Sequence, residues 1–168
     1  ATPKSGNVVF ERFKTTAKDM YVNLCISQKA VELAKDGGAM ANALDVEVKA
    51  SYDTAKWNLG RSLFGNGTGI LTTISALGTA GNTITVADTK NLKEGLIIDI
   101  YATGAASPQT NGAARRIKSV DRANKTVTIT GDASTFSAGF ITVQNSYKRE
   151  ITGLGTIFDD TVASIYGV

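Results

Sequence analysis

The apolar residues between Ala39 and Phe64 recur with the period of an α-helix. They are three or four positions apart, so their side chains form one stripe along a single helix. At about 1.5 Å of rise per residue, this helix is roughly 39 Å long, which is long for a chain of 168 residues. We expect the stripe to pack into a core and not to form a contact surface. It consists of Ala41, Leu44, Val48, Tyr52, Ala55, Leu59 and Leu63.

The segment 65–69, Gly-Asn-Gly-Thr-Gly, follows this helix directly. Glycine-rich loops that bind phosphate follow a strand and precede a helix, so that the anion faces the positive end of the helix dipole. Here the glycines follow the C-terminal end of a helix, where the dipole is negative. The order of the elements therefore indicates a helix stop and a turn, not a phosphate site.

From Ile70 onward the pattern changes to short strands separated by turn residues. Residues 121–125 are expected to link two strands as a hairpin, and residues 103–114 to form a mobile loop. Together these segments predict a small antiparallel sandwich or barrel over residues 72–147. The predicted strands are residues 82–86, 96–101, 116–120, 126–130 and 140–143.

The N-terminal part predicts an antiparallel hairpin with strands at residues 8–14 and 20–26. A two-stranded hairpin is only marginally stable alone, so we expect it to pack on something else, such as another subunit. Ser27 is a candidate N-cap for a short helix over residues 28–35, which the glycines of residues 36–38 would close.

Composition excludes several classes of function. Hydrophobic residues make up 42% of the chain, which excludes a wholly disordered protein. Histidine is absent, which excludes Ser-His-Asp catalysis and the ordinary zinc sites. The single cysteine, Cys25, lies among apolar residues, as a buried thiol does. No apolar run reaches the roughly 18 residues that span a membrane. The close acidic pairs, Asp45 with Glu47 and Asp159 with Asp160, lack convergent oxygen ligands. Catalysis by carboxylates or lysine stays open, but no motif supports it. We therefore expect no enzymatic activity, no cofactor and no metal site.

The net charge of +3 is concentrated in residues 70–131, which hold seven basic and four acidic residues. A basic surface suits a polyanion, but this one lacks the interleaved aromatic side chains on which bases stack. A solvated or subunit-facing sheet edge is the simpler interpretation. The candidates for contact with a polyanion are Arg115, Arg116, Lys118, Arg122 and Lys125.

Taken in order, these elements resemble the major capsid proteins of tailed bacteriophages. Residues 7–26 match the family's extended two-stranded E-loop, and residues 39–64 match its long spine helix. Residues 61–69 resemble the helix exit R-x-L-(F/Y)-G-(D/N)-G-x-G, and residues 151–160 resemble the return to the peripheral domain. Some members carry a β-domain inserted after the exit, and residues 72–147 look like such an insertion.

The resemblance implies an α+β fold with an extended hairpin, a spine helix and an inserted barrel or sandwich. The expected segments are residues 1–26 for the arm and E-loop, 27–71 for the peripheral helices, 72–147 for the insertion and 148–168 for the return. The chain stops at residue 168 without a terminating signal, so we expect the last segment to be truncated.

The resemblance further implies a structural protein that forms hexamers and pentamers of an icosahedral virion shell around double-stranded DNA. Assembly would take place in the bacterial cytoplasm, with scaffold, portal or decoration proteins as partners. Some relatives crosslink a loop lysine to a neighbour, but no acidic catalyst is indicated here. The candidates for intersubunit salt bridges are Arg12, Lys14, Lys18 and Asp19.

Two alternatives remain open from the sequence. The β-domain at residues 72–147 would suit a binding module for nucleic acid or glycan. A shell of the encapsulin type, a bacterial nanocompartment, shares the same ancestral fold, although the inserted β-domain argues against it.

Overall fold

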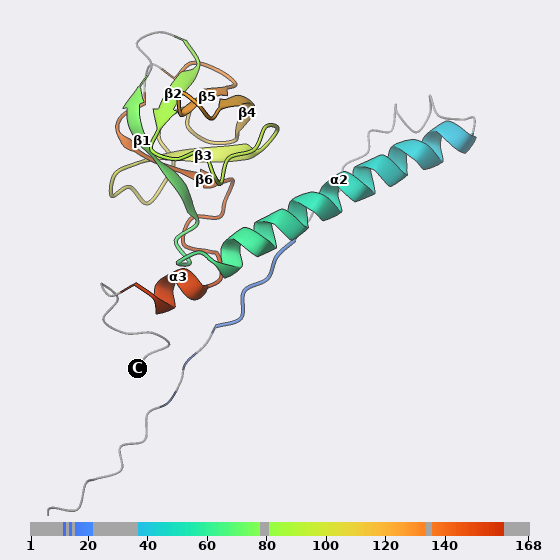
Figure 1. Cartoon of the computed structure of the whole chain (residues 1–168), viewed down its shortest axis with the longest axis horizontal. Coiled ribbons are helices and arrows are strands. Elements are labelled where there is room, and N and C mark those ends of the chain that lie inside the picture. Colours follow the sequence, from blue (N-terminus) through green and yellow to red (C-terminus); the bar gives the residue numbers. More distant parts are fainter. Residues whose placement is uncertain are drawn as a thin grey trace, which may run out of the picture.

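A computed structural model describes residues 12, 14, 16–21, 37–77, 81–133 and 136–159. Figure 1 shows a β-barrel, a long helix α2 that runs away from it, and a short helix α3 near the end of α2. Cys25, Ser27 and the expected helix over residues 28–35 lie outside the described residues.

The expected N-terminal hairpin is not formed at the positions that the structure describes. Arg12, Lys14 and residues 16–21 are exposed, and none of them belongs to a strand. The other residues of the two expected strands lie outside the described part of the chain.

The expected long helix is α2 (Gly37–Leu63), which has 27 residues. It begins two residues before the expected start, so Gly37 and Gly38 belong to this helix and do not close a preceding one. On its surface the Nζ atom of Lys49 lies 3.3 Å from Oδ2 of Asp45, the favourable spacing of four residues.

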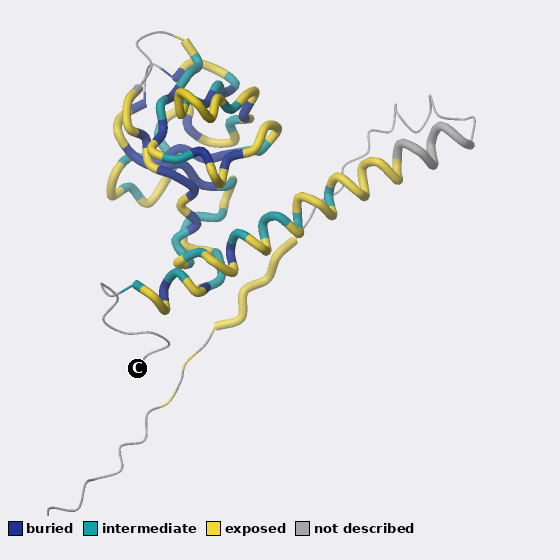
Figure 2. Tube along the Cα trace, viewed as in Figure 1, coloured by how far each residue is buried: buried dark blue, intermediate teal, exposed yellow. Residues whose placement is uncertain are grey.

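The expectation that the apolar stripe of α2 packs into a core is wrong for its large described side chains, whereas Ala55 is half-buried. Leu44 is 43% exposed, Tyr52 68% and Leu63 47% (Figure 2). The barrel and α3 lie at the C-terminal end of α2 and leave most of its length uncovered (Figure 1). Helical periodicity identifies an apolar face, but it does not say what covers that face.

The predicted β-domain is a closed antiparallel barrel with strand order β1-β2-β5-β4-β3-β6. Five of its strands begin and end within one residue of the predicted ranges, whereas β1 is absent from those predictions. The strands are β1 (Ile70–Leu77), β2 (Thr83–Val86), β3 (Ile97–Ala102), β4 (Arg115–Asp121), β5 (Thr126–Ile129) and β6 (Gly139–Val143).

The barrel encloses a core of branched aliphatic side chains. In β2, Ile84 and Val86 point inward, and the threonines between them are half-buried. Val127 and Ile129 repeat this alternation in β5. Because successive side chains of a strand point to opposite faces, this pattern turns one face of each strand into the barrel interior.

The loop over residues 103–114 is anchored, which corrects the expectation of a mobile loop. Oε1 of Gln109 accepts a hydrogen bond of 2.8 Å from the Ser137 N–H, and the Gln109 N–H donates to the Ile100 carbonyl at 2.8 Å. The buried carboxylate of Asp99 accepts hydrogen bonds of 2.8 Å from the Ala114 and Asn145 N–H groups. Through these contacts, the polar groups of the loop form hydrogen bonds with the outer wall of the barrel.

Candidate functional site: the helix–barrel junction

The chain crosses between α2 and the barrel twice, and the two crossings lie side by side. Asn66 on the outward crossing forms an antiparallel bridge with Thr152 on the return. The Gly153 N–H donates a hydrogen bond of 3.1 Å to the Gly65 carbonyl. Soon after this contact the chain enters α3 (Leu154–Ile157). The barrel is therefore inserted between two helices whose ends meet.

The outward crossing begins as the predicted helix stop and turn. The Gly65 N–H donates to the Ser62 carbonyl at 3.1 Å, which closes the last turn of α2. Gly69 has a φ of +75°, and a Cβ atom there would lie 2.6 Å from the Ser146 carbonyl oxygen. Glycine is needed at this position both for its backbone conformation and for the close approach of the return segment.

The return crossing also depends on the absence of side chains. A Cβ atom on Gly153 would lie 2.6 Å from the Ser62 carbonyl oxygen, and one on Gly155 would lie 2.8 Å from the Phe64 carbonyl oxygen. Both neighbours are backbone atoms at the end of α2, which cannot move aside as a flexible side chain can. The backbones of α2 and α3 therefore pack directly on each other.

A buried ion pair connects the two crossings. Nη1 of Arg61 donates a hydrogen bond of 2.9 Å to Oε2 of Glu150, and Nη2 donates a second, short one to Oε1. The side chains are only 9% and 10% exposed. The planar guanidinium also lies over the ring of Trp57, with Cζ 5.7 Å from the ring centroid. This two-point contact fixes the orientation of the two side chains as well as their distance.

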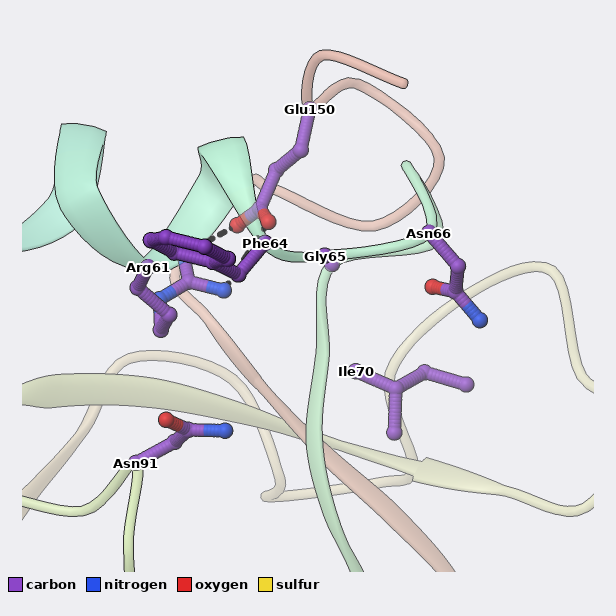
Figure 3. Close-up of a pocket in the computed structure, with 8 residues that line it drawn as sticks. Arg61, Phe64, Gly65, Asn66, Ile70, Asn91 and Glu150 are labelled. Carbon is purple, nitrogen blue, oxygen red and sulfur yellow. Dashed lines mark hydrogen bonds and ion pairs between the residues drawn. The ribbon is translucent and has the colours of Figure 1, made fainter. Parts of the chain in front are cut away.

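A pocket of about 240 Å³ opens beside this ion pair (Figure 3). Because Arg61 and Glu150 neutralise each other, the pocket offers mainly amide groups and apolar side chains. The lining residues include no cysteine, lysine or serine that would act as a nucleophile. They are Arg61, Phe64, Gly65, Asn66, Gly69, Ile70, Asn91 and Glu150.

An aromatic cluster holds the return segment on the outer wall of the barrel. The rings of Tyr101 and Phe140 are stacked with centroids 5.3 Å apart, and Tyr147 lies 4.8 Å and 5.0 Å from them. Burial raises the pKa of the Tyr101 hydroxyl, and the nearby Asp99 carboxylate adds to the effect. The cluster continues the apolar packing outside the barrel as far as the junction.

The four residues expected at subunit contacts, Arg12, Lys14, Lys18 and Asp19, are all exposed. Their side chains are therefore accessible in this chain. Whether they contact a neighbouring subunit stays a prediction.

The five basic residues of the β4–β5 hairpin do not form one continuous surface. Arg116 and Lys118 are exposed on β4, on either side of the inward-facing Ile117. Arg115 points the other way, and its guanidinium donates hydrogen bonds to the Asn111 and Thr130 carbonyls.

At the other end of the hairpin, Arg122 donates a long hydrogen bond of 3.5 Å to the Thr89 carbonyl. Lys125 is exposed in the turn, with a φ of +53°. Basic residues that are close in the sequence therefore do not share one surface, because side chains alternate along the strand and two of the arginines bond to backbone carbonyls.

Sequence reasoning missed the pairing of Arg61 with Glu150, which are separated by 89 positions. Arg61 belongs to the helix-exit pattern, but nothing in the sequence around Glu150 marks it as its partner. The two crossings of the inserted barrel bring these side chains together, so only the three-dimensional arrangement reveals the pair.

In the described part of the chain, no group of three or more acidic, cysteine or histidine residues is placed to hold a metal ion. None of the helices in that part has both the length and the apolar character needed to cross a membrane. Comparison of the chain with protein-family models, with curated proteins and with solved structures finds no match.

Proposed function

We propose that this chain is part of the major capsid protein of a tailed bacteriophage, a structural protein without enzymatic activity. In this proposal α2 is the spine helix of the peripheral domain and the barrel is its insertion domain. Residues 7–26 belong to the extended loop that reaches a neighbouring subunit.

The observation that carries the proposal is the position of the barrel in the chain. The barrel leaves the helix exit at residues 65–69 and returns at residues 150–153 to the same point. An insertion with adjacent entry and exit leaves the parent domain continuous. The resemblance to capsid proteins predicts an inserted domain directly after the helix exit.

The exposed apolar residues near the junction also support a subunit of an assembly. Large apolar side chains that lie exposed in one part of a protein often mark an interaction surface. The exposed apolar side chains come from the C-terminal end of α2, from the turn that follows it, and from α3 with the residue after it. Its members are Leu59, Leu63, Phe64, Leu154, Ile157 and Phe158.

As a shell protein, the subunit would assemble into hexamers and pentamers, with scaffold, portal or decoration proteins as further partners. The packaged double-stranded DNA would be an indirect partner inside the virion. Assembly would take place in the host cytoplasm. The exposed Arg12, Lys14, Lys18 and Asp19 would then form salt bridges, individually weak but repeated over the shell.

Electron microscopy of the full-length gene product tests the shell function. We expect closed particles of uniform diameter after expression in bacteria. A product that remains a monomer in the presence of its scaffold and portal proteins would count against a capsid function.

A polyanion-binding barrel is the second candidate, and the observation in its favour is the exposed pair Arg116 and Lys118. The internal hydrogen bonds of Arg115 weaken the case for this function, because they hold a third basic side chain of the predicted surface against the protein backbone. DNA affinity that falls steeply with salt, and that Arg116→Ala with Lys118→Ala abolishes, would support this function. Binding that does not depend on salt would oppose it.

A further inference from the structure

Asparagine is followed directly by glycine at two places in the chain. These are Asn66 with Gly67, in the outward crossing, and Asn111 with Gly112, in the loop over residues 103–114. In such a pair the backbone nitrogen of the glycine can attack the side-chain carbonyl carbon of the asparagine, because glycine has no Cβ atom to obstruct the approach. The two pairs have the same chemistry in the sequence, so only their structural surroundings distinguish them.

The pair in the loop is held by its backbone. Gly112 is buried, and its N–H donates a hydrogen bond of 2.7 Å to the Gln109 carbonyl. Its own carbonyl accepts a hydrogen bond of 2.9 Å from the Ile100 N–H, and the Asn111 carbonyl accepts one from the Arg115 guanidinium. The nitrogen that would attack is therefore occupied in a buried residue, so the loop must open before this pair can react.

The pair in the outward crossing is open to water and arranged for the reaction. Asn66 is exposed and lines the junction pocket (Figure 3). Its Oδ1 atom accepts hydrogen bonds of 3.2 Å from the Thr68 N–H and of 2.6 Å from the Thr68 hydroxyl. To reach Thr68, the side-chain carbonyl folds back over the peptide bond to Gly67, which brings its carbon toward the Gly67 nitrogen. The same two donors stabilise the negative charge that develops on Oδ1 during the attack.

We propose that Asn66 is a site of spontaneous covalent modification by deamidation. The Gly67 nitrogen forms a bond to the side-chain carbonyl carbon of Asn66 and loses its proton. The bond from that carbon to Nδ2 breaks, and ammonia leaves with the proton. Water then opens the resulting five-membered succinimide to aspartate or isoaspartate, so water is the one further reactant.

The junction opposes this reaction and is altered by it. The antiparallel bridge between Asn66 and Thr152 holds the outward crossing against the return, so the reaction is fastest when this contact loosens. Isoaspartate adds one carbon to the backbone of the outward crossing, which would displace Gly65 from the N–H of Gly153. Either product also adds a negative charge to the junction pocket.

Peptide mapping of the aged protein tests the proposal. The full chain is incubated at mildly alkaline pH, with or without urea, then digested with trypsin and analysed by mass spectrometry beside an unincubated sample. Cleavage after arginine and lysine places the two pairs in different peptides, residues 62–90 and 94–115. In the folded chain we expect Asn66 to lose its amide roughly ten times faster than Asn111, which must wait for a buried loop to open. In urea the two rates should be similar.

Two variants separate the causes. Thr68→Val removes the hydroxyl that donates to Oδ1 of Asn66, so it should slow the reaction in the folded chain and leave the rate in urea unchanged. Glu150→Ala removes the ion pair that connects the two crossings, so it should accelerate loss of the Asn66 amide in the folded chain. Neither variant should change the rate at Asn111, which serves as the internal control.

Equal rates at the two sites of the folded chain, or faster loss at Asn111, would contradict the proposal. An intact Asn66 in the folded chain, under conditions in which the chain in urea reacts, would contradict it as well. An unchanged rate in Thr68→Val would refute the role of the turn. The modification does not depend on the shell function, and each can fail while the other stands.

Discussion

Arg61 and Glu150 come from the end of a helix and from the return segment of the barrel, yet they share one buried contact. Nearly all of their surface is withdrawn from water, so each charge depends on the other for its compensation. The exposed pair of Asp45 and Lys49 has the same charges and a quite different environment. Burial therefore decides which ion pair matters for stability.

Glu150→Ala tests this difference. The substitution leaves the Arg61 guanidinium buried without its carboxylate, and we expect a loss of about 3 kcal/mol in the free energy of unfolding. The matched control Asp45→Ala should change it by about 0.5 kcal/mol or less, because that pair is exposed. Urea denaturation measures both, and similar small effects in the two variants would refute a structural role for the junction pair.

Asp121 gives a prediction about pH. It accepts hydrogen bonds from the backbone N–H of Asn124, from the side-chain amide of Asn124 and from the Ala123 N–H. These bonds, first of all the one from the Asn124 backbone, lower the pKa of the Asp121 carboxyl. Its contribution to stability is therefore complete above the pKa of the unfolded chain and is lost as the pH falls through the lowered pKa.

Titration followed by NMR should find the Asp121 pKa below the ordinary aspartate value. Asn124→Ala removes the side-chain donor and should raise that pKa toward the ordinary value. A normal Asp121 pKa in the unmodified protein would show that the turn does not favour the carboxylate.

At the scale of the elements, simple periodicity was enough to predict most of the barrel. Strands β2 and β5 alternate cleanly between inward aliphatic and outward threonine side chains. Strand β1 was not predictable in this way because its pairing shifts register twice, between Ile70 and Thr72 and between Ile74 and Ala76. Such irregularities break the period of two on which strand prediction depends.

The long helix and its glycine stop were also predictable from spacing and turn chemistry. The ion pair, the anchored loop at residues 103–114 and the separation of the basic residues were not. All three depend on contacts between residues far apart in the sequence, as Gln109 with Ser137 illustrates. Local pattern carries no information about such partners.

The direct packing of α3 on α2 predicts opposite effects of one substitution at two glycines. Gly153→Ala places a methyl group against backbone atoms of Ser62 and Leu63, and we expect a loss of about 2 kcal/mol in stability. Gly60→Ala has no atom within 4 Å of the new methyl group and should stabilise α2 by about 1 kcal/mol. Thermal unfolding distinguishes them, and equal effects would mean that the two backbones do not approach as closely as described.

At the scale of the whole molecule, the described residues combine one well-filled core with large uncovered apolar surfaces. The barrel encloses its own core, whereas α2 and α3 leave leucine, isoleucine and phenylalanine side chains exposed (Figure 2). A chain built in this way is suited to be one part of a larger assembly. In the proposed shell, the insertion of the barrel at a single junction would let it project without interrupting the helices.

Electron microscopy of the full-length gene product, expressed in bacteria, is the most direct test of the proposed shell function. The account predicts closed particles of uniform diameter, with the barrel as a separate projection at each subunit position. A product that stays a monomer or a small oligomer when produced with its scaffold and portal proteins would contradict it.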